Sequence, residues 1–201
     1  MILRNGSGCG VMVADSSTMK LQLANLVRKL SYREGDFLLA SGKRSSFYID
    51  LKATTLHPEA ANLIGKLAVA KVNDLGLMIA GVGGLTLGAD PLATAVSLAA
   101  WQEGMFWPAF IVRKDAKDHG TSRYIEGVEN IQLGAKLLVL EDVVTTGGSS
   151  LKAVERLRES GFDPVAVLAV VDREEGGAKA IADAGMQFIS LLTLRDVRES
   201  R

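Results

Sequence analysis

The sequence predicts an α/β domain with a mostly parallel central sheet that helices cover on both faces. From residue 77 onward, short apolar runs typical of buried strands alternate with segments that have helical spacing or helix caps. At residues 137–150, one such run leads through a Gly/Thr/Ser loop straight into an amphipathic helical pattern. The length of 201 residues suits a single domain, which would bury roughly 70% of the surface of its unfolded chain.

The N-terminal part is predicted to hold two helices with a hairpin between them. Residues 1–18 contain three glycines and are expected to form a flexible or loosely packed extension. Apolar spacing over residues 19–34 predicts a helix, with Ser17 or Thr18 as its cap. Two short strands, at residues 37–40 and 46–51, and a helix that begins at Pro58 are expected next.

The rest of the chain is predicted to alternate strands and helices. A strand at residues 77–80 is expected to lead into a glycine loop at 81–84, and Asp90 with Pro91 caps a helix. Gly161 is expected to close the helix that follows the Gly/Thr/Ser loop. The remaining strands are expected at residues 109–112, 136–140, 165–171 and 188–192.

Four loops are predicted to leave the carboxyl edge of this sheet. Ligands of parallel sheets bind at that edge, so we treat the four loops as one site. They span residues 81–84, 114–120, 142–149 and 172–177.

The composition excludes several classes of protein. Lys plus Arg and Asp plus Glu number 23 each, so no net field favours nucleic acid or an acidic membrane. A single cysteine, Cys9, cannot form an internal disulfide, which favours a reducing, cytoplasmic location. With two histidines and no ligand spacing, a structural zinc site is not expected. No apolar run approaches the ~18 residues of a membrane span.

Residues 137–150 have the chemistry of a sugar-phosphate site. The apolar run ends in two carboxylates, Glu141 and Asp142, and Gly, Thr and Ser residues precede the helix. Free backbone N–H groups and the helix dipole favour a phosphate there, while carboxylates accept hydrogen bonds from sugar hydroxyls. The glycine spacing matches neither a Walker loop nor a dinucleotide fingerprint. The alternative is an ordinary polar turn between strand and helix.

A second segment is strongly basic. Five basic side chains fall within eleven residues after the strand at 109–112. Such a loop suits capture of a polyanion such as pyrophosphate, although many basic clusters are simply solvated surface. The five are Arg113, Lys114, Lys117, His119 and Arg123.

These motifs carry a resemblance to a known family. Residues 137–150 resemble the 5-phosphoribosyl-1-pyrophosphate (PRPP) motif of the type I phosphoribosyltransferases. The pattern R-K-x-x-K-x-H-G from Arg113 resembles the mobile catalytic loop of the orotate phosphoribosyltransferases, and residues 41–52 and 171–177 resemble two other segments of that family. The resemblance covers about residues 19–195. One departure is Ala40, where many members have lysine.

The resemblance implies a fold, a reaction and partners. The fold is the type I phosphoribosyltransferase fold, with a small N-terminal hood at about residues 19–55 and a core at about 56–201. The reaction converts orotate and PRPP to orotidine 5′-monophosphate and pyrophosphate in pyrimidine biosynthesis, with Mg²⁺ as cofactor. A homodimer that shares the loop between subunits is also implied.

The resemblance also implies roles for individual residues. Glu141 and Asp142 would hold the ribose hydroxyls, with Asp142, Lys117 and His119 as the catalytic groups. Arg113, Lys114, Lys117 and His119 would bind pyrophosphate. The 5′-phosphate cradle would be Val143, Val144, Thr145, Thr146, Gly147, Gly148 and Ser149. Orotate would contact Lys43, Phe47, Tyr48, Thr145 and Arg173.

Two alternatives share the fold. One is another PRPP-dependent transferase that takes a purine or uracil, and the other is a PRPP-sensing regulator without activity. The basic loop and the segment VDREEGG argue against the first. A regulator would not need the basic loop, and it would usually carry a basic surface that the zero net charge does not suggest.

Overall fold

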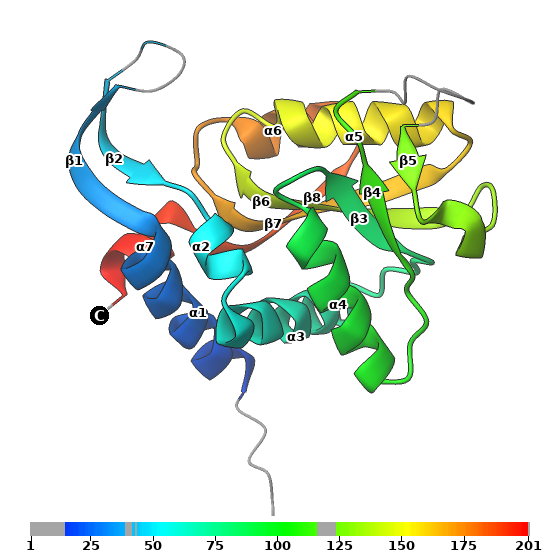
Figure 1. Ribbon diagram of the computed structural model, residues 1–201, viewed down its shortest axis with the longest axis horizontal. Helices are drawn as coiled ribbons and strands as arrows, with labels where there is room; N and C mark the ends of the chain where they lie inside the picture. Colours follow the sequence, from blue (N-terminus) through cyan, green and yellow to red (C-terminus); the bar gives the residue numbers. More distant parts are fainter. Residues whose placement is uncertain (1–14, 39–41, 43, 116–123, 201) are drawn as a thin grey trace, which may run out of the picture.

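The computed structural model describes residues 15–38, 42, 44–115 and 124–200. A six-stranded sheet with the order β5-β4-β3-β6-β7-β8 forms the centre, and a separate two-stranded sheet, β1-β2, stands beside it (Figure 1). Every neighbouring pair in the large sheet is parallel except β4–β5. The predicted class, a mostly parallel sheet flanked by helices, is confirmed.

The first helix begins earlier than predicted. Helix α1 spans Ser16–Ser31, and the Asp15 carboxylate caps it by accepting a hydrogen bond from the Thr18 N–H at 2.7 Å. Residues 16–18, predicted to belong to the extension, are therefore helical, because Asp15 supplies the cap that we assigned to Ser17 or Thr18. Residues 1–14 lie outside the described residues.

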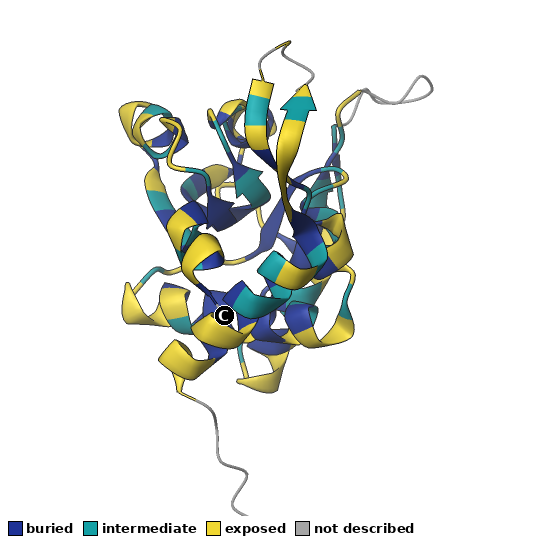
Figure 2. Cartoon of the chain, turned by 90° about the vertical axis from the view of Figure 1, so that its left-hand side faces the viewer, coloured by how far each residue is buried: buried dark blue, intermediate teal, exposed yellow. Residues whose placement is uncertain are grey.

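The N-terminal hairpin is antiparallel and stands away from the central sheet. It consists of β1 (Tyr32–Leu38) and β2 (Arg44–Ile49), followed by α2 (Lys52–Thr55) and α3 (Pro58–Asp74). Figure 2 shows the central sheet largely buried and much of the hairpin exposed. Successive side chains of a strand point to opposite faces, so Phe47 is buried while Tyr48 is exposed.

The predicted glycine loop at residues 81–84 is in fact mostly strand. Strand β3 spans Val82–Leu85 and is buried throughout, whereas residues 77–80 form no strand. A β-carbon at Gly83 would overlap the carbonyl oxygen of Phe110, and one at Gly84 would overlap that of Leu140. These glycines therefore permit close approach of the neighbouring strands, which is a known reason for glycine inside a strand. The loop itself follows β3 and precedes α4 (Asp90–Gln102).

Helices cover both faces of the large sheet. Helices α3 and α4 pack on one face and α5 and α6 on the other (Figure 1), and each face buries its own apolar cluster. Strand β6 runs four residues beyond its predicted end, through the two carboxylates to Val144. The remaining elements are β4 (Ala109–Val112), β5 (Ile125–Glu126), η1 (Val128–Asn130), β6 (Lys136–Val144), α5 (Gly148–Glu159), β7 (Asp163–Asp172), α6 (Gly177–Asp183), β8 (Gln187–Thr193) and α7 (Leu194–Glu199).

Within the described residues, no helix has both the length and the apolar character needed to cross a membrane.

Candidate functional site

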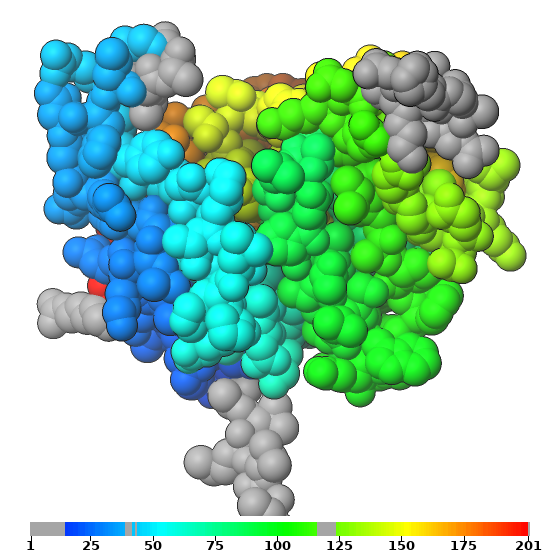
Figure 3. Space-filling model, in the orientation of Figure 1, coloured from blue at the N-terminus to red at the C-terminus, as the bar shows by residue number. Residues whose placement is uncertain are grey.

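Three loops meet at the carboxyl edge of the sheet, two of them where they were predicted and one, after β3, a few residues later than predicted. The loop after β3 touches the end of β6, since a β-carbon at Gly88 would lie 2.8 Å from Oδ1 of Asp142. The loop after β7 touches the loop after β6, since a β-carbon at Gly177 would lie 2.8 Å from the carbonyl oxygen of Thr145. Figure 3 shows the yellow surface of the β6–α5 region between the blue hairpin and the green surface of β3, β4 and α4.

The turn between β6 and α5 encloses a small polar hollow. Gly147 has φ +84°, which glycine adopts without strain, and its carbonyl accepts the first helical hydrogen bond from the Leu151 N–H at 2.9 Å. The N–H groups of the first helical turn have no partner within their own helix, so this hollow of about 90 Å³ can take an anion. It is lined by Glu141, Val143, Val144, Thr145, Thr146, Gly147, Gly148, Ser149 and Ser150.

The two carboxyl groups before this hollow have different surroundings. Glu141 is only 6% exposed, and its Oε2 accepts a hydrogen bond from the Ser150 hydroxyl at 3.0 Å. Burial, together with the neighbouring charge of Asp142, raises the pKa of Glu141 to about 8. Asp142 is half-buried, and its Oδ1 accepts a hydrogen bond from the Val143 N–H at 2.8 Å. Ser150, which the sequence reasoning left without a role, therefore orients Glu141.

We expect Glu141→Gln to remove a pH dependence of folding stability. Because burial lifts the pKa from 4.5 to about 8, the folded protein keeps a proton that the unfolded chain releases within this window. Stability then falls as the pH rises, by up to about 1.4 kcal/mol per pH unit. Urea unfolding of the unliganded protein at pH 5.5, 6.5 and 7.5 measures this, and the advantage of the glutamine variant should grow with pH. Glu155→Gln, an exposed change on α5, is the control. Parallel pH curves for wild type and Glu141→Gln would contradict the expectation.

The loop between β3 and α4 begins a few residues later than predicted, after Leu85, and it holds further polar candidates. The Thr86 hydroxyl donates a hydrogen bond to Oδ2 of Asp90 at 2.7 Å, whereas the buried Oδ1 of Asp90 has no partner among the described residues. The peptide bond between Thr86 and Leu87 is cis. Gly88 faces the Asp142 carboxyl group across this loop. The signal that could have located the loop is Asp90-Pro91, because Pro in the first helical turn marks where the loop ends.

Lys52 is a further candidate that the sequence did not indicate and the structure does. It stands at the last position of the hairpin motif, and its Nζ lies 2.9 Å from Oδ1 of Asp50. The pKa of Lys52 is raised chiefly by its hydrogen bond to Asp50, and the charges of Asp142 and Tyr48 add to the effect. A cation of α2 is thus held within electrostatic reach of the carboxylate at the end of β6.

Arg173 and Phe47 meet on one side of the site. The guanidinium of Arg173 lies 4.8 Å from the centre of the Phe47 ring, and its Nη2 is 2.7 Å from Oε1 of Glu175. Arg198 of α7 lies over the same ring at 4.6 Å. Tyr48 is turned to the other face of the hairpin, where its ring is 5.7 Å from that of Phe37. The structure therefore brings Arg173 to Phe47 and not to Tyr48.

The basic segment is only partly described. Arg113 forms an ion pair with Glu126, with 3.3 Å between Nη1 and Oε1, and Lys114 is exposed. Lys117, His119 and Arg123, and likewise Ala40 and Lys43 of the hairpin, lie outside the described residues. Their proposed roles stay predictions.

A mostly parallel sheet with a glycine-rich turn that can take an anion, preceded by two carboxyl groups, is the arrangement of a type I phosphoribosyltransferase. The chain is 47% identical over 186 residues to the orotate phosphoribosyltransferase of Nostoc sp., a match that covers 92% of this chain and 88% of that protein. The chain therefore belongs to the orotate phosphoribosyltransferase family.

Solved structures agree with this assignment. The orotate phosphoribosyltransferase of Mycobacterium tuberculosis H37Rv in complex with Fe(III) dicitrate matches with a TM-score of 0.79 and 45% identity, over 89% of this chain and 98% of that one. The M. tuberculosis protein in complex with PRPP matches with a TM-score of 0.76 and 41% identity, over 90% and 99% of the two chains. No family model matches the chain.

Proposed function

We propose that this protein transfers the 5-phosphoribosyl group of PRPP to orotate, giving orotidine 5′-monophosphate and pyrophosphate in the pyrimidine pathway that leads to UMP. The observation that carries the proposal is the polar hollow between β6 and α5. It follows the carboxyl pair of Glu141 and Asp142 in the chain, and Glu141 lines it. A ligand with a terminal phosphate and vicinal hydroxyls matches this order of groups.

The protein would bind PRPP at two of its groups, the 5′-phosphate and the ribose hydroxyls. The 5′-phosphate takes hydrogen bonds from the N–H groups around Gly147 and Gly148, and the ribose hydroxyls reach the carboxyl groups of Asp142 and Glu141. Because the pKa of Glu141 is raised to about 8, its carboxyl group carries a proton at neutral pH. The pair then offers both an acceptor and a donor to a ribose diol.

The acceptor is held by charge and by packing. The planar guanidinium of Arg173 suits the carboxylate of orotate, because its fork of N–H groups binds carboxylates at two points. In the free protein Glu175 occupies this guanidinium and Phe47 packs beneath it, so orotate would replace Glu175 as the partner of Arg173. Thr145 belongs to the same set, since the carbonyl oxygen of its neighbour Val144 accepts a hydrogen bond from the Arg173 N–H at 3.0 Å. Lys43 completes the proposed orotate set, and Tyr48 would contribute through its backbone, because its side chain lies on the hairpin face opposite Phe47 and Arg173.

The reaction requires stabilisation of a leaving pyrophosphate. Orotate N1 attacks the anomeric carbon while the bond to pyrophosphate breaks, so negative charge grows on the leaving oxygens. We assign Lys117 and His119 to that charge, and Arg113 and Lys114 to binding of the pyrophosphate. The protein mainly positions two anions for attack and stabilises the charge that departs.

The donor set fits a Mg²⁺ that is carried by the substrate. Among the described residues no three His, Cys, Asp or Glu side chains gather to form a metal cage, and Mg²⁺ is commonly held by one or two carboxylates together with substrate phosphates. We expect Mg²⁺ to be held mainly through PRPP, with no protein side chain as a direct ligand. When bound, Mg²⁺ neutralises charge on the pyrophosphate.

We also propose a homodimer, in which the basic segment of one subunit serves the site of the other. An exposed apolar patch on α4 and the turn after it supports an interface between subunits: Trp101 is 66% exposed, Phe106 is 68% exposed, and Leu98 lies beside them. These side chains flank a depression of about 200 Å³. Exposed apolar patches commonly mark interaction surfaces.

Trp101→Glu is expected to weaken this association by roughly 30-fold or more, because a central interface tryptophan often contributes 2 kcal/mol or more. Analytical ultracentrifugation over a range of protein concentrations measures the change. Leu133→Glu is the matched control, since Leu133 is 78% exposed but lies far along the chain, between η1 and β6. Equal dissociation constants for wild type and Trp101→Glu would remove α4 from the interface.

We place the reaction in the cytoplasm, as the single cysteine suggests, and expect neither nucleic acid nor a membrane as partner. The activity is tested by following the absorbance of orotate with PRPP and Mg²⁺, with adenine, hypoxanthine and uracil offered in parallel. Orotate should be consumed, with equimolar release of pyrophosphate. Consumption of another base without orotate would identify a different transferase, and PRPP binding without any turnover would identify a regulator.

A further inference from the structure

Arg156 of α5 holds both ends of the basic segment. Its Nη2 donates a hydrogen bond to the carbonyl oxygen of Lys114 at 2.6 Å, and its Nη1 donates another to the carbonyl oxygen of Arg113. On the returning side, its guanidinium lies 4.1 Å from the centre of the Tyr124 ring. The residues before and after segment 116–123 therefore share a single side chain as their support.

This contact is buried and joins the two ends directly. Arg156 is only 8% exposed, so its hydrogen bonds compete little with water, and charge-assisted bonds of this kind are the stronger ones. The Arg113 N–H also donates to the carbonyl oxygen of Tyr124 at 2.7 Å. The main chain therefore closes the stem of the segment, and Arg156 fastens that stem to α5.

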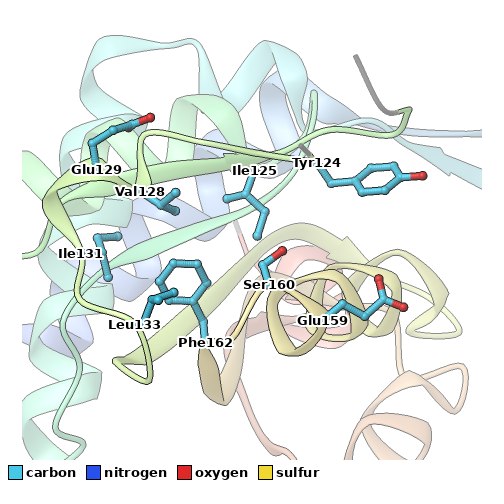
Figure 4. Close-up of a pocket in the computed structure, with 9 residues that line it drawn as sticks. All are labelled: Tyr124, Ile125, Val128, Glu129, Ile131, Leu133, Glu159, Ser160 and Phe162. Carbon is cyan, nitrogen blue, oxygen red and sulfur yellow. The ribbon is translucent and has the colours of Figure 1, made fainter. Parts of the chain in front are cut away.

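The position of Tyr124 agrees with this role. Tyr124 lies at the edge of a groove of about 530 Å³ beside β5 and the end of α5. Figure 4 shows its ring directed away from the apolar side chains of that groove, Ile131 and Phe162. Tyr124 nevertheless packs against the apolar cluster to which these two side chains belong, and it also lies over the guanidinium of Arg156.

Helix α5 connects this stem to the phosphate hollow. The helix begins at Gly148, which lines the hollow, and Arg156 follows eight residues later. At a rise of 1.5 Å per residue this is about 12 Å along one straight element. One rigid helix therefore carries the cradle for the 5′-phosphate and the support for the segment assigned to pyrophosphate.

We propose that Arg156 is a positioning residue that fixes the ends of segment 116–123 to the helix of the phosphate cradle. The chain at Arg113, Lys114 and Tyr124 is then fixed relative to the phosphate cradle. This contributes to the orientation of the groups assigned to the leaving pyrophosphate, Lys117 and His119. This inference rests on the proposed function, since those two residues are given a role there.

Arg156→Met tests the proposal, because methionine keeps an apolar stem and removes both hydrogen bonds and the charge over Tyr124. Two readouts are needed. Without substrate, hydrogen exchange of the Arg113 amide should accelerate by roughly tenfold or more, while amides of β7 keep their rates. In the assay, kcat should fall by roughly tenfold, while KM for orotate stays near the wild-type value because Arg173 is untouched.

Arg158→Met is the matched control. Arg158 is exposed on the same helix and contacts only the Met186 sulfur, at 3.4 Å, among the hydrogen-bond partners described, so neither readout should change. Arg156→Lys keeps a charge but lacks the fork, and it should show accelerated exchange at Arg113 even if the methionine variant does not fold.

Unchanged exchange at Arg113 in a folded variant would overturn the proposal. So would accelerated exchange throughout the sheet, which indicates a general structural role, and so would accelerated exchange with an unchanged kcat. If wild type consumes no orotate, the proposed function fails separately, because the exchange measurement alone still shows whether Arg156 fastens the stem.

Discussion

Lys117→Ala should lower the turnover number with orotate by on the order of 10²–10³, the loss seen when a single group that stabilises transition-state charge is removed. The physical reason is the charge that grows on pyrophosphate as its bond to the anomeric carbon breaks. A lysine ammonium close to those oxygens interacts more strongly with the transition state than with the bound substrate. The effect is therefore expected in kcat, with a smaller change in KM for PRPP.

Steady-state kinetics at saturating PRPP measure this, and Lys66→Ala, an exposed change on α3, serves as the control. Binding of PRPP to the Lys117→Ala variant by calorimetry separates lost affinity from lost rate. An unchanged kcat would exclude Lys117 from the chemistry and leave the basic segment a binding role alone.

Arg173→Gln should raise KM for orotate by roughly 10²-fold, since the variant loses the charge of a two-point contact to a carboxylate. The binding of PRPP should be unaffected, because the phosphate hollow lies on the β6–α5 turn. The guanidinium is held in the free protein by Glu175 and by the ring of Phe47. Its position is therefore set before the substrate arrives.

The comparison that decides this prediction pairs Arg173→Gln with Arg195→Gln, an exposed arginine at the start of α7. Initial rates over a range of orotate concentrations at saturating PRPP should show the increase in KM in the first variant alone. If both variants behave as wild type, the Arg173–Glu175 pair is a structural salt bridge, and the orotate carboxylate is bound elsewhere.

The local structure around the candidate site was best predicted where it depends on residues adjacent in the chain. The run from β6 through the turn to α5 is a strand, a glycine-rich turn and a helix N-terminus, and each part follows from neighbouring residues. An anion cradle with two carboxyl groups before it could therefore be predicted from residues 137–150 alone, and the hollow lies where that reasoning places it. The alternation of apolar runs and helical patterns predicted the sheet in the same way.

The loop predicted at residues 81–84 was wrong, because the conformation there depends on strands that are distant in the chain. Gly83 and Gly84 indicate a loop when read in sequence, yet they lie in a buried strand because the carbonyl groups of Phe110 and Leu140 approach them. Those oxygens belong to β4 and β6, tens of residues away. The error placed the start of the loop before α4 a few residues too early.

Local patterns in this chain were enough to indicate a parallel sheet, a sugar-phosphate cradle and, through its motifs, the family. They act over a few residues, because turn formation, helix capping and side-chain alternation depend on near neighbours. The raised pKa of Glu141, the pairing of Arg173 with Phe47 and the support that Arg156 gives to both ends of the basic segment emerged with the folded chain. Each depends on burial and on contacts between strands and helices that are far apart in sequence, and these exist only once the sheet has assembled.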